Sequence, residues 1–361
     1  PWFSDWGRDV MVALPGLTLA TGRAEIARGV LRMAAGFVRD GLLPNQFPSS
    51  RRDATFNSVD AALWYIEAAR QYYGETKDRS LLDEIWPALV QIGEKYTTGT
   101  RFGIGVDPAD GLLRAGQVGV QVTWMDAKIG DWVITPRQGK PVEVNALWLN
   151  ANVTLGQFAR ILGQPAGPWD AAASKARASF TKFWNEKGGY CFDTIDGPEG
   201  NDDALRPNQV IALALPECPL TEEQQRSIVQ VTMRRLLTSY GLRTLSPDHA
   251  EYVGSYEGDL LSRDSSYHQG TAWAWLIGPF LIAHLRAFRD PEAALQFLRP
   301  MARQTAWRGL GTIAELFDGD PPFHPRGAVA QAWSVSEVLR AWTLIDSISG
   351  RQERLSANPQ G

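Results

Sequence analysis

The chain has 361 residues, of which 44% are hydrophobic and 21% charged, so it can bury the core of at least one large globular domain. A net charge of −4 with scattered basic residues excludes the positive surface that nucleic acid or an anionic membrane requires, and it favours a neutral ligand. No apolar run approaches about 20 residues, which excludes a membrane span. The two cysteines, Cys191 and Cys218, form neither a disulfide framework nor a zinc motif and favour a reducing, cytoplasmic location.

Apolar residues recur at the helical period and predict eleven helices of two alternating kinds. The even-numbered helices are amphipathic and are expected to face solvent. They span residues 24–39, 80–96, 169–186, 221–240 and 292–308. The odd-numbered helices are apolar nearly all round in their first turns, as helices between neighbours must be. They span residues 8–19, 58–73, 145–162, 207–215, 271–288 and 329–345.

Residues 101–141 form the longest non-helical insertion, in which the alternating runs 103–106 and 119–123 are expected to pair as a hairpin. The tail 347–361 is too polar to supply a twelfth helix, which we therefore expect upstream of Pro1. Since the chain opens without an initiator methionine, we expect residues 1–361 to be one domain of a longer protein with an upstream N-terminal domain.

Unusual polar and aromatic residues precede six of the odd-numbered helices. They occupy residues 5–9, 45–57, 123–145, 206–209, 267–270 and 315–320. In an up-and-down array, the connections that enter every second helix lie at the same end. The six segments are therefore expected to converge at one mouth, where helix dipoles help to hold ionised carboxylates. The pattern predicts an all-α protein, an (α/α)6 barrel of inner and outer helices.

Motifs of nucleotide-binding, metalloprotease and serine-hydrolase sites are absent from the sequence, and residues 107–111 lack the spacing of a calcium loop. We expect no metal and no cofactor. What remains near the mouth is a set of acids: Asp5, Asp9, Asp126, Asp131, Glu143, Glu315, Asp318 and Glu337. Acids among indoles suit a sugar-cleaving pocket, because rings cover the apolar faces of a pyranose and a carboxylic acid protonates the glycosidic oxygen.

Four motifs occur in order along the chain. They are Trp6-Gly7-Arg8-Asp9, Thr123-Trp124-Met125-Asp126-Ala127, Val142-Glu143-Val144-Asn145-Ala146-Leu147-Trp148 and Ala330-Gln331-Ala332-Trp333-Ser334. Together they resemble the C-terminal amylo-α-1,6-glucosidase domain of glycogen debranching enzymes, over essentially the whole chain. The resemblance implies a glucoamylase-like (α/α)6 barrel. Such a domain removes α-1,6-linked glucosyl residues from a branched α-glucan, glycogen or limit dextrin, with inversion and in glycogen catabolism.

The resemblance also implies roles for single residues. Asp126 is expected to be the catalytic acid and Glu315 the base, while Arg8 and Asp9 grip hydroxyls of the terminal glucose. Replacing Arg8 by lysine is then expected to reduce activity and leave melting unchanged. Further substrate contacts are expected from Trp6, Trp124, Glu143, Asn145, Trp148, His268, Gln269 and Trp333.

Two alternatives stay open at this stage. One is another exo-acting (α/α)6-barrel glycosidase, of the glucoamylase or trehalase type, because similarity of fold does not separate linkages. The other is a carbohydrate-binding protein without activity. Release of glucose from limit dextrin, maltotriose or trehalose distinguishes the three hypotheses.

Overall fold

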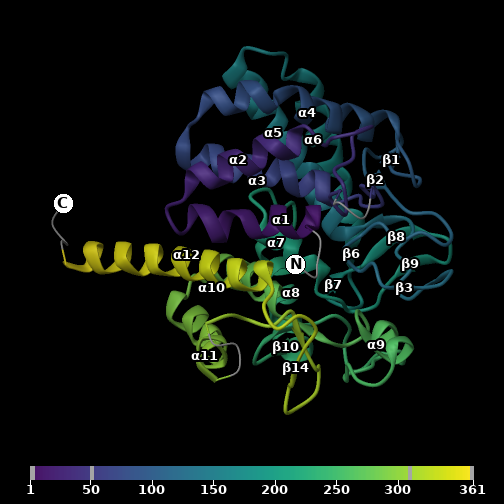
Figure 1. The fold of residues 1–361 in the computed structure, drawn as a ribbon, viewed down its shortest axis with the longest axis vertical. Helices are drawn as coiled ribbons and strands as arrows, with labels where there is room; N and C mark the ends of the chain where they lie inside the picture. The colour runs from purple at the N-terminus through teal and green to yellow at the C-terminus, as the bar shows by residue number, and fades with distance from the viewer. Residues whose placement is uncertain (1–4, 49–52, 308–310, 358–361) are drawn as a thin grey trace.

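The computed structural model describes residues 5–48, 53–307 and 311–357, and it is mostly helical (Figure 1). Within these residues, six helices form a ring in which each packs on the next and the last packs on the first. They are α1 (Gly7–Leu14), α3 (Ala61–Thr76), α5 (Val142–Leu162), α7 (Asn208–Ala214), α10 (Ile277–Phe288) and α12 (Ala332–Ala357). The mostly helical character predicted from the sequence is confirmed.

A second set of helices packs on the outside of this ring. These are α2 (Ala24–Ala35), α4 (Arg79–Thr98), α6 (Gly167–Ser179), α8 (Glu222–Arg235) and α11 (Pro291–Trp307). Their amphipathic pattern has the expected consequence, as α8 illustrates: it begins at a capping box of Thr221 and Gln224 and buries Ile228 and Val229.

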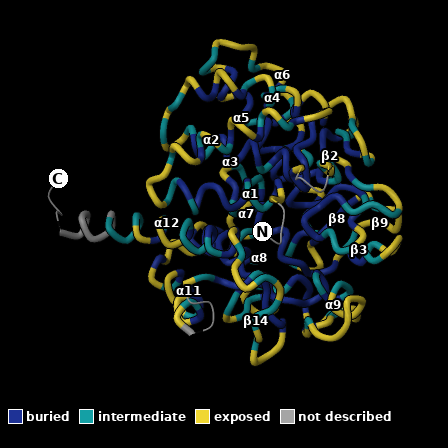
Figure 2. The backbone as a smooth tube through the Cα atoms, in the orientation of Figure 1, coloured by how far each residue is buried: buried dark blue, intermediate teal, exposed yellow. Residues whose placement is uncertain are grey.

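The core lies between the two sets of helices, as the buried segments in Figure 2 show. Helix α5 is buried over most of its length, because α3 and α7 flank it in the ring while α4 and α6 cover it from outside. This position explains why its sequence is apolar nearly all round. No helix in the described residues is both long and apolar enough to cross a membrane.

Several predicted boundaries are wrong. The first helix continues from α1 as a π-helical turn, Pro15–Leu19. Residues 271–276 contain a strand, β12 (Ala272–Trp273), and a 3-10 turn, η3 (Ala274–Leu276), before α10 begins. Another 3-10 turn, η2 (Phe180–Phe183), ends the segment of α6, and the short helix α9 (Leu260–Ser266) was not predicted. Helix α12 continues to Ala357 and projects from the body, so residues 347–357 are helical, contrary to the expectation from their polar sequence (Figure 1).

A five-stranded antiparallel sheet was also missed. Its strands follow one another in the order β10 (Leu237–Thr238), β11 (Gly241–Arg243), β12, β13 (Leu316–Phe317) and β14 (Pro325–Arg326). Within the 101–141 insertion, β1 (Gly105–Val106) pairs with β2 (Leu113–Arg114), so the predicted pairing of 103–106 with 119–123 is wrong. A second pair there is β3 (Lys128–Ile129) with β4 (Trp132–Val133).

Two further small sheets are present in the described residues, and the first of them leads into α5. One has the order β5 (Lys140–Pro141), β8 (Thr194–Gly197), β9 (Gly200–Asp202). The other pairs β6 (Trp184–Asn185) with β7 (Tyr190–Cys191). Since β5 leads directly into α5, the pairing of β5 with β8 fixes the segment that precedes this helix.

Candidate active site

Arg8 stands in the first turn of α1 and joins three segments. Its Nε atom donates to both carboxylate oxygens of Asp60, at 2.8 and 2.9 Å, and Nη1 donates to Oδ2 of Asp126 at 3.0 Å. Nη2 donates to the hydroxyl of Ser58 at 3.2 Å. Because Arg8 and Asp60 are both buried, this arginine fixes the start of α3 and the Asp126 loop against α1.

Asp126 is a carboxyl group whose surroundings favour the protonated form. Its side chain is 23% exposed, and burial raises its pKa above the ordinary value. The charge and the hydrogen bond of Arg8 act in the opposite direction and lower the pKa. Since desolvation is the larger effect, the group is favoured in its acidic form relative to a carboxyl in water.

Glu315 directly precedes β13 and is held at both carboxylate oxygens. Oε1 accepts a hydrogen bond from the Tyr267 hydroxyl at 2.5 Å, and Oε2 accepts one from the amide of Ala328 at 2.8 Å. The main-chain amide of Glu315 also donates to the Ala328 carbonyl at 2.9 Å. The two hydrogen bonds, one to each oxygen, hold the carboxyl group of Glu315 in one orientation.

Asp9 links these two groups electrostatically. The pKa of Asp9 is raised to about 7, chiefly by burial; the charge of Arg8 lowers it, and the negative charges of Asp126 and Glu315 raise it. Its Oδ1 accepts a hydrogen bond from the Gln331 amide at 3.4 Å. The structure therefore brings together the predicted acid, the predicted base and the Arg8–Asp9 pair.

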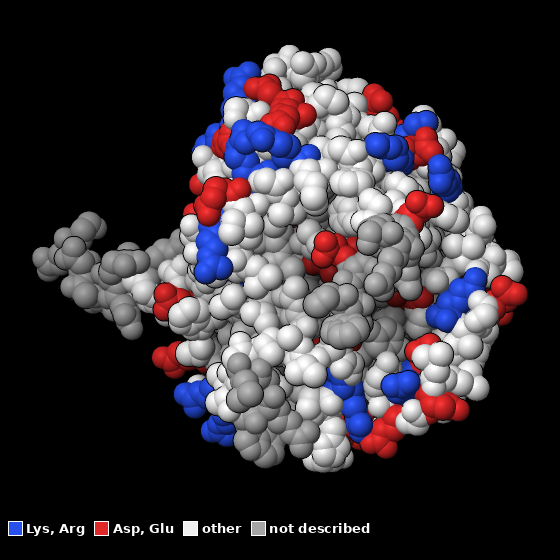
Figure 3. Space-filling view, viewed as in Figure 1, with Lys and Arg blue, Asp and Glu red and all other residues white. Residues whose placement is uncertain are grey.

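Acidic side chains also stand out on the surface near this place. Figure 3 shows them at the centre of one face, close to where the described chain begins, while basic side chains lie mostly toward its edges. This distribution agrees with a site that receives an uncharged ligand.

An aromatic cluster lies beneath the Asp126 loop. The ring of Trp124 meets those of His268, Trp273 and Trp275 edge to face, at centroid distances of 5.3, 5.5 and 5.3 Å. Trp275 stacks on Trp333 at 5.0 Å. Both predicted tryptophans, Trp124 and Trp333, are nearly fully buried, so they support the site from below.

His268 is a buried polar group inside this cluster. Neither ring nitrogen has a hydrogen-bond partner among the described residues, and the same holds for the indole nitrogens of Trp275 and Trp333. Burial lowers the pKa of His268 well below its ordinary value, so the ring is neutral. Its two ring nitrogens, like the two indole nitrogens, are buried polar atoms without a partner in the part of the chain that the structure describes.

Three predicted substrate contacts on α5 have partners inside the protein instead. Glu143 is buried and forms two hydrogen bonds with Arg137, at 2.5 and 2.6 Å. The Asn145 side chain bonds the backbone of Leu113 and Pro141, and the Trp148 indole bonds the Gly111 carbonyl. These groups hold the insertion on α5, and the Glu143 side chain is 1% exposed and therefore not open to a sugar.

Arg137 extends this buried network. It also bonds Asp193, with a shortest distance of 2.6 Å, and Asp193 accepts a bond from Asn208 at 2.7 Å. The Asn208 oxygen in turn accepts a bond from the Trp124 indole at 2.7 Å. The network thus reaches the residue two positions before Asp126, which makes it a support for the catalytic loop.

Gln269 and Trp6 differ in their surroundings. The Gln269 amide bonds Arg206 at 2.8 Å and the Ile134 carbonyl at 3.2 Å, so it ties loops together. Trp6 precedes α1 and is 38% exposed, so it reaches the surface. Of the predicted tryptophan contacts, Trp6 is the one suited to cover a sugar ring.

The remaining acidic candidates lie outside this arrangement. Asp5 and Asp131 are exposed, and Asp318 forms an ion pair with Arg326 at 2.8 Å. Glu337 pairs with Arg340 and lines a cavity between α1, α3, α7, α10 and α12. Sequence reasoning had not singled out Asp60, although its position at the start of a helix was a visible signal.

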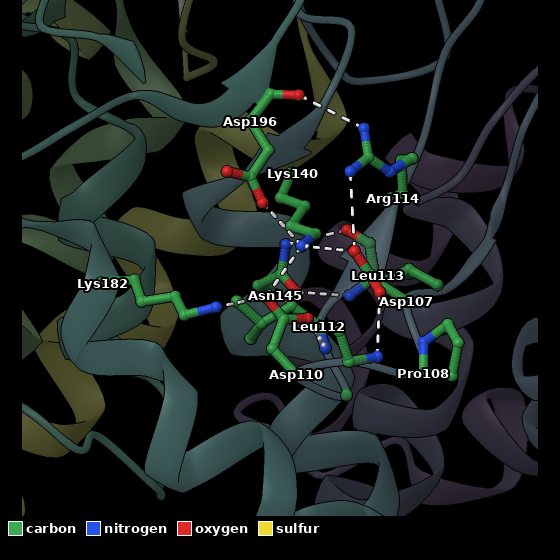
Figure 4. Close-up of polar contacts among 12 residues, drawn as sticks. Asp107, Pro108, Asp110, Leu112, Leu113, Arg114, Lys140, Asn145, Lys182 and Asp196 are labelled. Carbon is green, nitrogen blue, oxygen red and sulfur yellow. Dashed lines mark hydrogen bonds and ion pairs between the residues drawn. The ribbon is translucent and has the colours of Figure 1, made fainter. Parts of the chain in front are cut away.

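One group of carboxylates is close enough to hold a metal ion, but a lysine occupies its centre. The carboxylates of Asp107, Asp110 and Asp196 lie within 4.8 Å of one another. The Lys140 ammonium points between them and donates to each, at 2.9, 2.8 and 2.7 Å (Figure 4). Lys182 adds a bond to Asp110 at 2.8 Å. The cluster therefore acts as an ion-pair network that joins Lys140 of β5 to Asp107 and Asp110 within the insertion and to Asp196 of β8.

The comparisons with known proteins point to carbohydrate enzymes. The family model described as amylo-alpha-1,6-glucosidase matches residues 1–340. The glycogen debranching enzyme of Saccharomyces cerevisiae is 25% identical over 371 residues, a match that covers 77% of this chain and 24% of the yeast protein. The chain therefore spans about a quarter of the length of that relative.

Solved structures with a similar fold come from Thermus thermophilus. The GH63 mannosylglycerate hydrolase in complex with Tris and D-glycerate has a TM-score of 0.70 at 15% identity, covering 94% of this chain and 93% of that one. The same enzyme in complex with glucose has a TM-score of 0.68 at 16% identity, covering 95% and 94%. At such identities the likeness describes the fold alone.

Proposed function

This chain belongs to the amylo-alpha-1,6-glucosidase family, and we propose that it removes α-1,6-linked glucosyl residues from glycogen or limit dextrin with inversion. The observation that carries the proposal is the pair of unlike carboxyl groups. Asp126 is partly buried and its pKa is raised, whereas Glu315 accepts hydrogen bonds at both oxygens. Carboxyl groups in different environments can divide the roles of acid and base.

In the proposed reaction, Asp126 gives its proton to the glycosidic oxygen as the bond from that oxygen to C1 breaks. A water molecule attacks C1 from the opposite face, and Glu315 takes a proton from this water. The products are free β-glucose and the shortened glucan. Afterwards Asp126 regains a proton from solvent and Glu315 loses one.

Substrate binding is assigned to the groups that surround the two acids. Arg8 and Asp9 would grip hydroxyls of the terminal glucose, and Trp6 would cover an apolar sugar face. His268 offers two unpaired nitrogens to a hydroxyl or a bridging water. Trp124, Trp333 and the α5 residues would act from below, as supports.

The ring of α1, α3, α5, α7, α10 and α12 supports an (α/α)6 barrel as the architecture. Helices α2, α4, α6, α8 and α11 would fill five of its outer positions within the described residues. We take residues 1–361 as one catalytic unit, with residues 101–141 as an insertion beside the mouth.

The test is a comparison of substrates. The protein is incubated with isomaltosyl-branched limit dextrin, maltotriose, trehalose and mannosylglycerate, and released glucose or mannose is assayed. We expect glucose from limit dextrin, appearing first as the β-anomer in proton NMR spectra recorded before mutarotation. Release from trehalose or mannosylglycerate alone would contradict the proposed substrate, initial α-glucose would contradict inversion, and no release would leave a binding protein.

A further inference from the structure

Tyr267 contacts the proposed base but takes no part in the reaction as written above. It follows α9 directly, and its hydroxyl donates to Oε1 of Glu315 at 2.5 Å. Burial and the negative charge of Glu315 raise the pKa of this phenol well above its ordinary value. The phenol therefore keeps its proton, and the direction of the hydrogen bond is fixed from Tyr267 to Glu315.

The phenol ring is held in place by its neighbours. It packs against His268, Trp273 and Tyr256, at centroid distances of 4.8, 4.9 and 5.5 Å. The Tyr267 carbonyl accepts hydrogen bonds from the Thr271 hydroxyl at 2.6 Å and from the Trp273 indole at 3.0 Å. A ring fixed at both its backbone and its faces can hold its hydroxyl at one point.

The second oxygen of Glu315 is confined from the other side. Its partner is the amide of Ala328, at 2.8 Å. Gly327, at φ +66°, leaves just enough room, since a Cβ atom at this position would lie 2.2 Å from Oε2. The carboxylate of Glu315 is thus held between a phenol and a backbone amide.

We propose that Tyr267 is a positioning residue that, opposite the Ala328 amide, orients the Glu315 carboxylate toward the attacking water. Each carboxylate oxygen has two acceptor directions, so the two bonds leave acceptor sites for the water. The phenol keeps its own proton throughout, while the proton of the water passes to Glu315. The inference rests on the proposed function, because it assigns a role to Tyr267 through the base.

The first test compares Tyr267→Phe with Tyr252→Phe. Tyr252 donates to Oδ1 of Asp320 at 2.8 Å, so the control also removes a phenol–carboxylate bond, but one away from Glu315. We expect Tyr267→Phe to lower kcat about 10- to 100-fold with KM within about twofold of wild type, since a misplacement near 1 Å costs up to about 100-fold. Tyr252→Phe is expected to keep wild-type kcat.

The second test reaches the other oxygen and covers the case in which Tyr267→Phe does not fold. Gly327→Ala pushes on Oε2 and is expected to lower kcat in the same way. Gly22→Ala is its control, because Gly22 also has a positive φ, of +72°, but nothing within 4 Å of an added Cβ atom. The control therefore reports the cost of backbone conformation alone.

The outcomes separate the two proposals. If wild type cleaves limit dextrin while Tyr267→Phe, or in its place Gly327→Ala, keeps wild-type kcat, the positioning role is overturned and the function stands. Equal losses in Tyr267→Phe and Tyr252→Phe also overturn it. If wild type cleaves none of the four substrates, the proposed function fails and the role of Tyr267 fails with it.

Discussion

The contacts of Arg8 depend on the shape of its guanidinium group as well as on its positive charge. Its planar fork donates to Asp60, Asp126 and Ser58 from three separate nitrogen atoms, a geometry that the single nitrogen of a lysine does not reproduce. We expect Arg8→Lys to reduce kcat/KM at least 100-fold. We also expect it to lower the free energy of unfolding by about 2 kcal/mol, because it disrupts a buried ion pair. This expected loss of stability differs from the expectation drawn from the sequence alone, in which replacing Arg8 by lysine leaves melting unchanged.

Arg28 supplies the matched control for this prediction. Its Nε donates to Asp78 at 2.9 Å and its Nη2 to Ser80 at 3.2 Å, in a similar pattern that is partly exposed and lies on the outer helices. Arg28→Lys should leave kcat/KM unchanged and should lower the free energy of unfolding by less than about 1 kcal/mol. Steady-state assays and thermal melts of both variants check the prediction, and equal behaviour of the two would contradict it.

A substrate with a better leaving group distinguishes the proposed roles of Asp126 and Glu315. Such a substrate compensates for the loss of the catalytic acid but not for the loss of the base. Fluoride needs less protonation than a sugar alkoxide, so α-glucosyl fluoride bypasses much of the work of an acid. We expect Asp126→Asn to lose at least 100-fold in kcat on limit dextrin but to recover most of it on the fluoride. Glu315→Gln should lose activity on both, and recovery in the wrong variant would reverse the assignment.

Burial explains which single residues the sequence could not assign. Glu143 and Asn145 belong to a motif at the mouth, yet their partners come from other segments, such as Arg137 and Leu113. A motif records which residues occur together and does not say whether a side chain faces a ligand or a neighbour. The Arg8–Asp126 contact, by contrast, joins two of the four motifs.

At the scale of elements, long helices were predictable and the sheet was not. An apolar face repeats several times along a helix such as α4, whereas strands of two or three residues are too short for any alternation to appear. The five-stranded sheet also joins segments far apart, for example Trp273 with Leu316. This sheet places Glu315 at the edge of the site, so the base could be located only through a resemblance.

The ion-pair network of the insertion makes a prediction for Lys140. Its ammonium is buried between three carboxylates, and its removal leaves Asp110 buried with less compensation. We expect Lys140→Met to lower the free energy of unfolding by about 3 kcal/mol. Lys182 contacts the same oxygen of Asp110 but is 52% exposed, so Lys182→Met should cost less than about 1 kcal/mol. Urea unfolding of both variants checks this, and equal costs would contradict it.

At the scale of the whole molecule, Asp9 links stability to pH. Its pKa rises from 3.8 to about 7 on folding, chiefly through burial, so the native state holds a proton that the unfolded state has lost. Stability from this group is therefore present below about pH 4 and falls as pH rises toward 7. Asp9→Asn should remove that loss.

The measurement is the difference in unfolding free energy between Asp9→Asn and wild type. The unfolding free energy of the variant minus that of wild type should grow by about 1–2 kcal/mol between pH 5 and pH 7 and then level off. This value is about half of what the full pKa shift would give, because the Asp9 side chain is partly exposed to solvent. The same variant at pH 5 is its own reference. A difference that does not depend on pH would show that Asp9 is not desolvated.

The ring closes between segments from opposite ends of the chain. The Ser336 hydroxyl on α12 donates to the Ala13 carbonyl on α1 at 2.7 Å, and Gln331 reaches Asp9. During synthesis, α1 leaves the ribosome more than 300 residues before the helix that covers it. Its apolar side must stay open for that time, at the rates of chain elongation about half a minute. We expect nascent chains to depend on chaperones, and no product that ends before α12 to carry activity.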